Sequence, residues 1–102
     1  MVHESSDETS DEVRYLVVDG RGWRRQDPAL PEDVAARLRS HLGRARSAVR
    51  TMSRADEDPA PARHRVGVAK QGLGERGTPW WEQSTQQRRE RWEAALHVLD
   101  DG

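Results

Sequence analysis

The sequence contains no cysteine, no phenylalanine and no isoleucine, and lysine supplies only one of its seventeen basic residues. Without cysteine the chain has no disulfide, no thiolate zinc site and no thiol nucleophile. No segment approaches the run of about 18 apolar residues that a membrane-spanning helix needs. The N-terminus also lacks the basic start and apolar run of a signal peptide. We therefore expect a cytoplasmic protein.

Aliphatic core residues are scarce, with nine valines and seven leucines among 102 residues. This share is below the roughly 20% that marks many disordered chains. Two features argue against disorder, because the net charge is only −1 and four tryptophans supply large apolar surfaces. A chain of this length has room for one domain. We predict a single small domain at 13–102 with a thin core.

Charge is unevenly distributed along the chain. Residues 1–12 contain five acidic residues and no lysine or arginine, which leaves residues 13–102 with a net charge of +4. A polar, serine-rich acidic segment buries too little apolar surface to offset the entropy of ordering. We predict that residues 1–12 form a disordered, solubilising tail. An alternative is that this tail shields the basic surface of the domain.

A β-hairpin is predicted at 13–25. Residues 13–18 are mostly β-branched, aromatic or aliphatic, which favours a strand. Asp19-Gly20 is typical of a two-residue turn in which both residues have positive φ. In the register that this turn sets, Leu16 faces Trp23 on one side of the ribbon. We expect that side to pack on helices, because an isolated two-stranded ribbon is only marginally stable.

Three helices are predicted after the hairpin, at 31–54, 62–73 and 85–99. The first has apolar residues at steps of three and four and begins with Pro31 and two acidic residues. The second carries apolar residues at helical spacing, although a strand at 65–69 is an alternative.

The third helix follows a sequence typical of a capping box, Ser84 with Gln87. The fold class is therefore α+β, an N-terminal β-hairpin packed on a three-helix, mostly helical domain.

Sequence motifs that would indicate catalysis, metal binding or nucleotide binding are weak. The segment 72–77 matches G-x-G-x-x-G, but Thr78-Pro79 follows at once, so no helix opens there to hold a phosphate. We interpret this glycine block as a turn that ends a helix, with nucleotide binding or enzymatic use as a remote alternative. We expect none of the four histidines to have a histidine or carboxylate partner at i+4 on one clear face. We predict no catalytic residue, no metal ligand and no cofactor.

The strongest functional signal is an arginine stripe on the first helix. Between Val34 and Ala55 there are six arginines and no acidic residue. At about 100° per residue, four of them share one face, roughly opposite the apolar side. These four are Arg39, Arg46, Arg50 and Arg54. The stripe could be a solvated face partly paired with Glu90 and Glu93, or it could meet an acidic protein or a nucleic-acid backbone.

Trp80-Trp81 has two interpretations. With arginines nearby in the sequence, the pair could be a platform on which nucleic-acid bases stack. In a chain with so few aliphatic residues, the two rings could instead close the core.

Several blocks resemble a family of small actinobacterial proteins that often carry the label "biopolymer transporter Tol". These blocks are 20–24, the connector from Asp27-Pro28 to Pro31, and 69–81. The resemblance covers roughly 13–82, and Leu73-Gly-Glu-Arg-Gly-Thr-Pro-Trp-Trp81 is its most specific part. The label implies a β-propeller or membrane machinery, which this chain is too short to form. The resemblance therefore brings no catalytic residue and no functional weight.

The leading functional hypothesis is a small non-enzymatic interaction module. Its arginine-rich helix would bind an acidic protein partner or associate with a second copy of the chain. The alternative is a small nucleic-acid-binding protein that uses the arginine stripe and exposed tryptophan.

Overall fold

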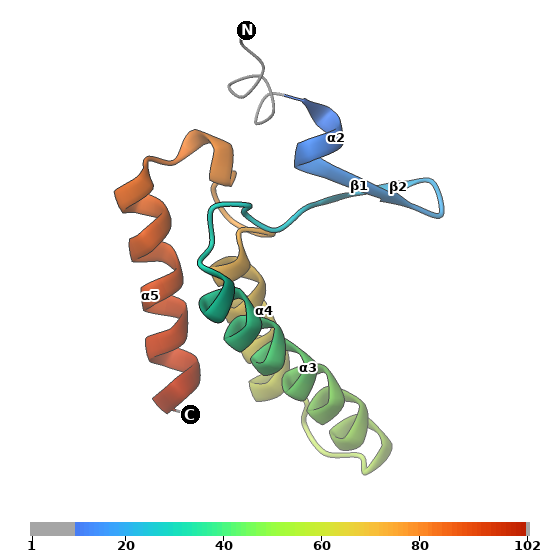
Figure 1. Ribbon diagram of the computed structural model, residues 1–102. Coiled ribbons are helices and arrows are strands. Elements are labelled where there is room, and N and C mark those ends of the chain that lie inside the picture. Colours follow the sequence, from blue (N-terminus) through green and yellow to red (C-terminus); the bar gives the residue numbers. More distant parts are fainter. Residues whose placement is uncertain (1–9, 102) are drawn as a thin grey trace, which may run out of the picture.

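The computed structural model describes residues 10–101. A one-turn helix and a two-stranded antiparallel sheet precede three long helices, and a short 3-10 helix separates the last two (Figure 1). The elements are α2 (Asp11–Arg14), β1 (Tyr15–Val18), β2 (Arg21–Arg24), α3 (Glu32–Arg54), α4 (Ala60–Leu73), η1 (Trp80–Glu82) and α5 (Thr85–Asp101). The predicted α+β class, an N-terminal hairpin followed by three helices, is confirmed.

The predicted tail at 1–12 lies outside the described residues except for its last three. Ser10 caps α2, because its hydroxyl accepts a hydrogen bond of 3.2 Å from the Glu12 amide. The Glu12 carbonyl in turn accepts a hydrogen bond of 2.9 Å from the side chain of Arg25. Residues 10–12 therefore belong to a capped helix rather than to a disordered tail, and residues 13 and 14 are helical rather than part of the predicted hairpin.

The turn and register of the hairpin agree with the sequence analysis. Asp19 and Gly20 have φ values of 52° and 79°, as the predicted two-residue turn requires. Leu16 pairs with Trp23 across the two strands. The short turn therefore fixes which side chains share each face of the ribbon.

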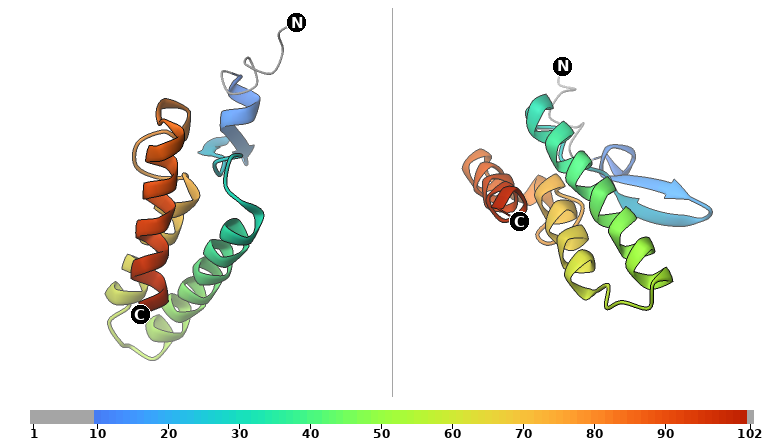
Figure 2. Two further views of the ribbon diagram at one scale, coloured as in Figure 1. Left: turned by 60° about the vertical axis from the view of Figure 1, so that its left-hand side comes forward. Right: turned by 90° about the horizontal axis from the view of Figure 1, so that it is seen from below.

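The burial predicted for this hairpin is wrong. The ribbon projects to one side of the helices (Figures 1 and 2), and Leu16 and Trp23 are each 43% exposed. Contact with the rest of the fold is made at the base of the ribbon, where Tyr15 meets the Trp81 ring edge-on at 5.6 Å between centroids. Much of the apolar surface of the hairpin is therefore left uncovered by the described chain.

The three long helices form one layer, with α4 between α3 and α5 (Figure 2). The apolar stripe predicted for the first helix faces α4, and its Leu38 and Leu42 are 0% and 6% exposed. The core is drawn from all three helices and consists of Val34, Leu38, Leu42, Ala69, Leu73, Ala95, Leu96 and Leu99. This core is thin, as the scarcity of aliphatic residues predicts.

Helix boundaries differ from the predictions by one or two residues. Pro31 is the residue before α3 rather than its first residue. Residues 65–69 are helical and belong to α4, which rules out the alternative strand. The capping box before α5 is confirmed, because the Ser84 amide donates to Gln87 Oε1 at 2.8 Å and the Gln87 amide donates to Ser84 Oγ at 3.1 Å.

The connector between β2 and α3 is held by Asp27, which is only 1% exposed. Its carboxylate pairs with Arg91 at 2.7 Å and with Arg88 at 3.3 Å, both from α5. Its backbone amide donates to the Leu73 carbonyl at 2.8 Å. We refer to Asp27, Arg88 and Arg91 as the Asp27 cluster. Because every partner is within hydrogen-bonding range, this buried charge is compensated.

The glycine block lets α4 and η1 approach this cluster. Gly74 ends α4 with φ 89°, and a Cβ there would come within 3.0 Å of Asp27 and 3.2 Å of Trp80. A Cβ at Gly72 would come within 2.6 Å of Ala95, where α4 meets α5. The interpretation of 72–77 as a helix-terminating turn is therefore confirmed at Gly74. These two glycines face protein atoms and leave no room for a phosphate.

Candidate binding surface

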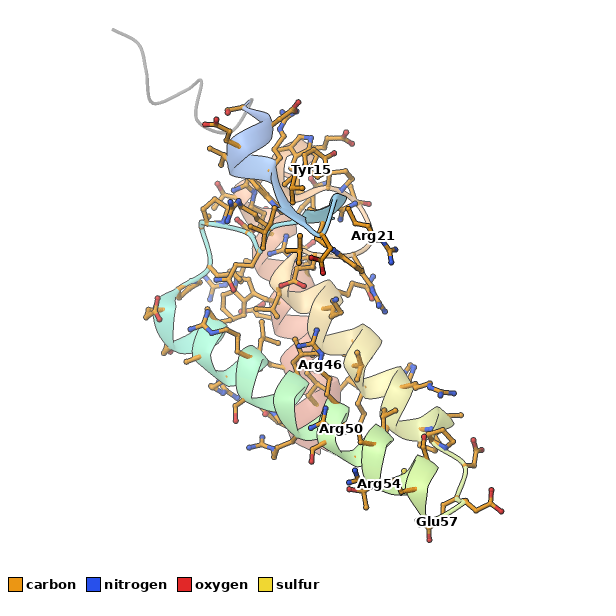
Figure 3. The ribbon with its side chains drawn as sticks, turned by 90° about the vertical axis from the view of Figure 1, so that its right-hand side faces the viewer. Tyr15, Arg21, Arg46, Arg50, Arg54 and Glu57 are labelled. Atoms are coloured by element: carbon orange, nitrogen blue, oxygen red, sulfur yellow. The ribbon has the colours of Figure 1, made fainter. Side chains whose placement is uncertain are left out.

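Three of the four arginines predicted to form a stripe lie in a row along α3. Arg46, Arg50 and Arg54 follow one another away from the hairpin on the side that Figure 3 shows. Arg39 is engaged elsewhere, because its guanidinium donates to Gln26 Oε1 at 3.2 Å and approaches Glu32 Oε2 at 3.4 Å. The stripe therefore begins at Arg46.

The acidic residues of α5 do not neutralise this row. Glu93 pairs with Arg89 at 2.9 Å, and Glu90 accepts a hydrogen bond of 3.1 Å from Gln86. The predicted pairing of the stripe with Glu90 and Glu93 is therefore not found within residues 10–101.

Two further arginines join the row from α4 and from the loop that follows it. A hollow of about 430 Å³ on the α3–α4 side is lined by Arg46, Val49, Arg50, Arg63, Val66 and Arg76. We define the arginine face as Arg46, Arg50, Arg54, Arg63 and Arg76. All five are exposed, and none makes a side-chain hydrogen bond or ion pair within the described part of the chain.

Arg63 and Arg76 were not among the binding residues predicted from the sequence. They lie 13 and 26 residues beyond Arg50 in the chain, on another helix and in the glycine block. The packing of α4 against α3 brings Arg63 and Arg76 to the hollow that Arg46 and Arg50 also line. One sequence signal was present, since Arg63 precedes Val66 by three residues and so shares its helix face.

A larger hollow of about 910 Å³, which we call the hairpin groove, lies between the hairpin and the helices. Its apolar lining comes mainly from the hairpin, and its charged lining comes from the end of β2, the connector, α3, α4 and the glycine block. The lining residues are Leu16, Val18, Trp23, Arg24, Arg25, Gln26, Pro28, Arg46, Lys70, Glu75 and Arg76. Because Arg46 and Arg76 line both hollows, the groove and the arginine face form one continuous surface.

Trp23 is the exposed aromatic residue of this surface. Its ring is 43% exposed and lies beside two cations, with Arg21 Cζ at 4.7 Å and Lys70 Nζ at 5.7 Å from the ring centroid. Lys70 also pairs with Glu75 at 3.6 Å. Such contacts between cations and an aromatic face are each worth about 0.5–1 kcal/mol at exposed sites.

Trp80 and Trp81 do not form the binding platform that their sequence allowed. Trp80 is 0% exposed, and its Nε1 donates a hydrogen bond of 3.0 Å to the Arg25 carbonyl. Trp81 is partly buried, with the guanidinium of Arg14 at 4.5 Å from its ring centroid. Trp80 cannot touch a partner, so the assignment of Trp80 as a binding residue is wrong. The interpretation as a closure of the core fits the pair.

A cluster of titratable groups lies away from this surface, between α3 and α5. His41 Nε2 is 2.8 Å from Asp100 Oδ1, and Arg37 pairs with the same carboxylate. The hydrogen bond from His41, aided by the charge of Arg37, lowers the pKa of Asp100 below its ordinary value. A second histidine, His97, lies 3.6 Å from Asp101 one turn along α5. The expectation that no histidine has a carboxylate partner at i+4 is therefore wrong at His97, whereas His41 finds its carboxylate on another helix.

No family model, curated protein or solved structure matches this chain. Within residues 10–101, no helix is both long and apolar enough to cross a membrane. The same part of the chain brings no three His, Cys, Asp or Glu residues together in an arrangement that could hold a metal ion.

Proposed function

We propose that this chain is a small non-enzymatic cytoplasmic interaction module that binds an acidic protein surface through its arginine face. The observation that carries the proposal is a set of five exposed arginines, from two helices and a loop, without an acidic partner in residues 10–101. Like charges held side by side repel one another unless an anionic surface meets them. An acidic partner would be attracted to this face and oriented by it.

Self-association through the same face is disfavoured. A two-fold contact between copies would place one arginine face against another. Juxtaposed like charges weaken such a contact. We therefore assign the face to a different, acidic molecule.

Nucleic acid is the second candidate ligand, and a specific observation favours it. Arg46, Arg50 and Arg54 form a basic track, and the half-exposed Trp23 lies in the groove that adjoins it. A basic track with an exposed aromatic side chain is the combination that single-strand-binding proteins use.

The test is a titration of the full chain with fluorescent polyglutamate. We expect binding that weakens with added salt, because exposed charge pairs are screened. Arg50→Glu and Arg63→Glu should each lower the affinity at least about fivefold. The matched control is Arg89→Glu on α5, where the side chain is 69% exposed, and its effect should stay below about twofold. Equal losses in all three variants, or no binding at about 50 mM salt, would contradict the proposal.

The same titration with a mixed-sequence single-stranded oligonucleotide distinguishes the second candidate. Four phosphate contacts would give a slope of log affinity against log salt near about −3, because each contact releases about 0.7 counterions on single strands. Replacing two arginines of the face should roughly halve that slope. Tighter binding of the oligonucleotide than of polyglutamate would place nucleic acid first.

A further inference from the structure

We propose that the hairpin groove is the docking site for a partner segment in which acidic and aliphatic side chains are combined. This inference rests on the proposed function and adds the chemistry of the ligand. The arginine face alone selects only negative charge. The adjoining groove adds an apolar surface, so that the whole site selects a segment with both properties.

The apolar part of the groove is one face of the hairpin. Leu16, Val18 and Trp23 are 43%, 46% and 43% exposed and project from the same side of the ribbon. A two-stranded ribbon is at best marginally stable when nothing covers it. Contiguous exposed apolar side chains rimmed by polar residues mark interaction sites. A ligand with aliphatic side chains would cover this face.

The charged part of the groove requires that the occupant be acidic. Arg46 and Arg76 border the groove, and neither has a side-chain partner within residues 10–101. Arg24, Arg25 and Lys70 are the other cations of the lining, and Glu75 is its single acidic residue. A second copy of the chain would bring the same cations to the contact, whereas an acidic segment would neutralise them.

The surroundings of Trp23 favour a peptide over a nucleic acid in this groove. A base would have to stack on a ring that Arg21 and Lys70 already approach, at 4.7 and 5.7 Å from its centroid. Base stacking would therefore compete with two existing contacts. Aliphatic side chains can instead pack on Leu16 and Val18 and leave those cations in place.

The alternation of side chains along β1 supplies a matched pair of variants. Val18 lines the groove, whereas its neighbour Val17 points to the opposite face of the ribbon and is 69% exposed. Val18→Asp and Val17→Asp thus place the same charge on the same exposed strand, inside and outside the groove. Thermal melting would confirm that both variants fold.

The experiment compares two labelled peptides of equal length and charge, one alternating Glu with Leu and the other alternating Glu with Ser. We expect the Glu–Leu peptide to bind about tenfold more tightly to the full chain, because it buries apolar surface as well as charge. Val18→Asp should remove that advantage, and Val17→Asp should keep it. Val18→Ser, which adds no charge, should reduce the advantage in the same direction.

The outcomes separate this inference from the proposed function. Equal affinities of the two peptides, or equal losses in Val17→Asp and Val18→Asp, would overturn the groove as a docking site. The proposed function would survive that result if binding of the Glu–Ser peptide still depended on Arg50. Failure of both peptides to bind would overturn both proposals. Tighter binding of an oligothymidylate than of the Glu–Leu peptide would also overturn the groove proposal.

Discussion

In the Asp27 cluster the guanidinium of Arg91 donates to three acceptors, whereas in the arginine face that of Arg50 donates to none within residues 10–101. The acceptors of Arg91 are Asp27 at 2.7 Å, Gln83 at 2.7 Å and the Gly72 carbonyl at 3.2 Å. One arginine therefore holds the connector, η1 and the end of α4 in place. The other leaves its donors available to a ligand. The same residue type therefore holds three segments together where it is buried and stays exposed to solvent on α3.

The largest expected difference in stability is between substitutions of Trp80, which lies beside the Asp27 cluster, and of Trp23, which lines the hairpin groove. Trp80→Ala should lower the free energy of unfolding by about 3–5 kcal/mol, because the buried ring leaves a cavity. Trp23→Ala should lower it by less than about 1 kcal/mol, since the ring remains 43% exposed and contributes contacts with cations. Denaturant unfolding of both variants measures the difference. Equal costs would show that the hairpin is part of the folding core.

The arginines offer the next contrast. Arg91→Ala should cost about 3 kcal/mol, because the carboxylate of Asp27 stays buried and loses the closer of its two guanidinium partners. Arg50→Ala should change stability by no more than about 0.5 kcal/mol, as exposed substitutions usually do. The two variants can be compared by urea unfolding at neutral pH. A neutral Arg91→Ala would mean that the Asp27 cluster does not hold the connector.

The smallest expected difference in stability is between alanine substitutions of two glycines. Gly74→Ala should cost about 1–3 kcal/mol, because residue 74 has φ 89° and its Cβ would press on Asp27. Gly22→Ala, in the exposed strand β2, should be neutral or stabilise by less than about 1 kcal/mol, since nothing lies within 4 Å of the added Cβ. Melting temperatures would reveal both signs. A stabilising Gly74→Ala would contradict the close approach described at the end of α4.

Local signals in the sequence predicted the elements well. Asp19-Gly20 indicates the hairpin turn, the apolar steps indicate α3, and Ser84 with Gln87 marks the start of α5. These features depend on residues close in the chain, and local geometry was enough to predict them.

The sequence could not predict which tryptophan is buried or which arginines gather. Trp80 is buried because the turn at Gly74 brings η1 against the connector, a contact that depends on residues 55 positions apart. Arg63 and Arg76 join Arg46 only after α4 packs on α3. The ion pair between Asp27 and Arg91 could not be predicted either, because the two residues are 64 positions apart in the chain. Such features arise from tertiary packing, which a single sequence does not encode as a local pattern.

The long separation between Asp27 and Arg91 has a consequence for how the protein is made. All the residues that line the hairpin groove lie between residues 16 and 76 of the chain. The connector between β2 and α3, however, is held by Arg88 and Arg91 of α5. During synthesis, at about 5–20 residues per second, a nascent chain has the hairpin and the first two long helices before the last helix has left the ribosome. Closing a loop of this length comes late, because its entropy cost precedes any contact that rewards it. The hairpin groove should therefore reach its final shape only after α5 has been synthesised and has packed on the connector, so chains that end before α5 would lack it.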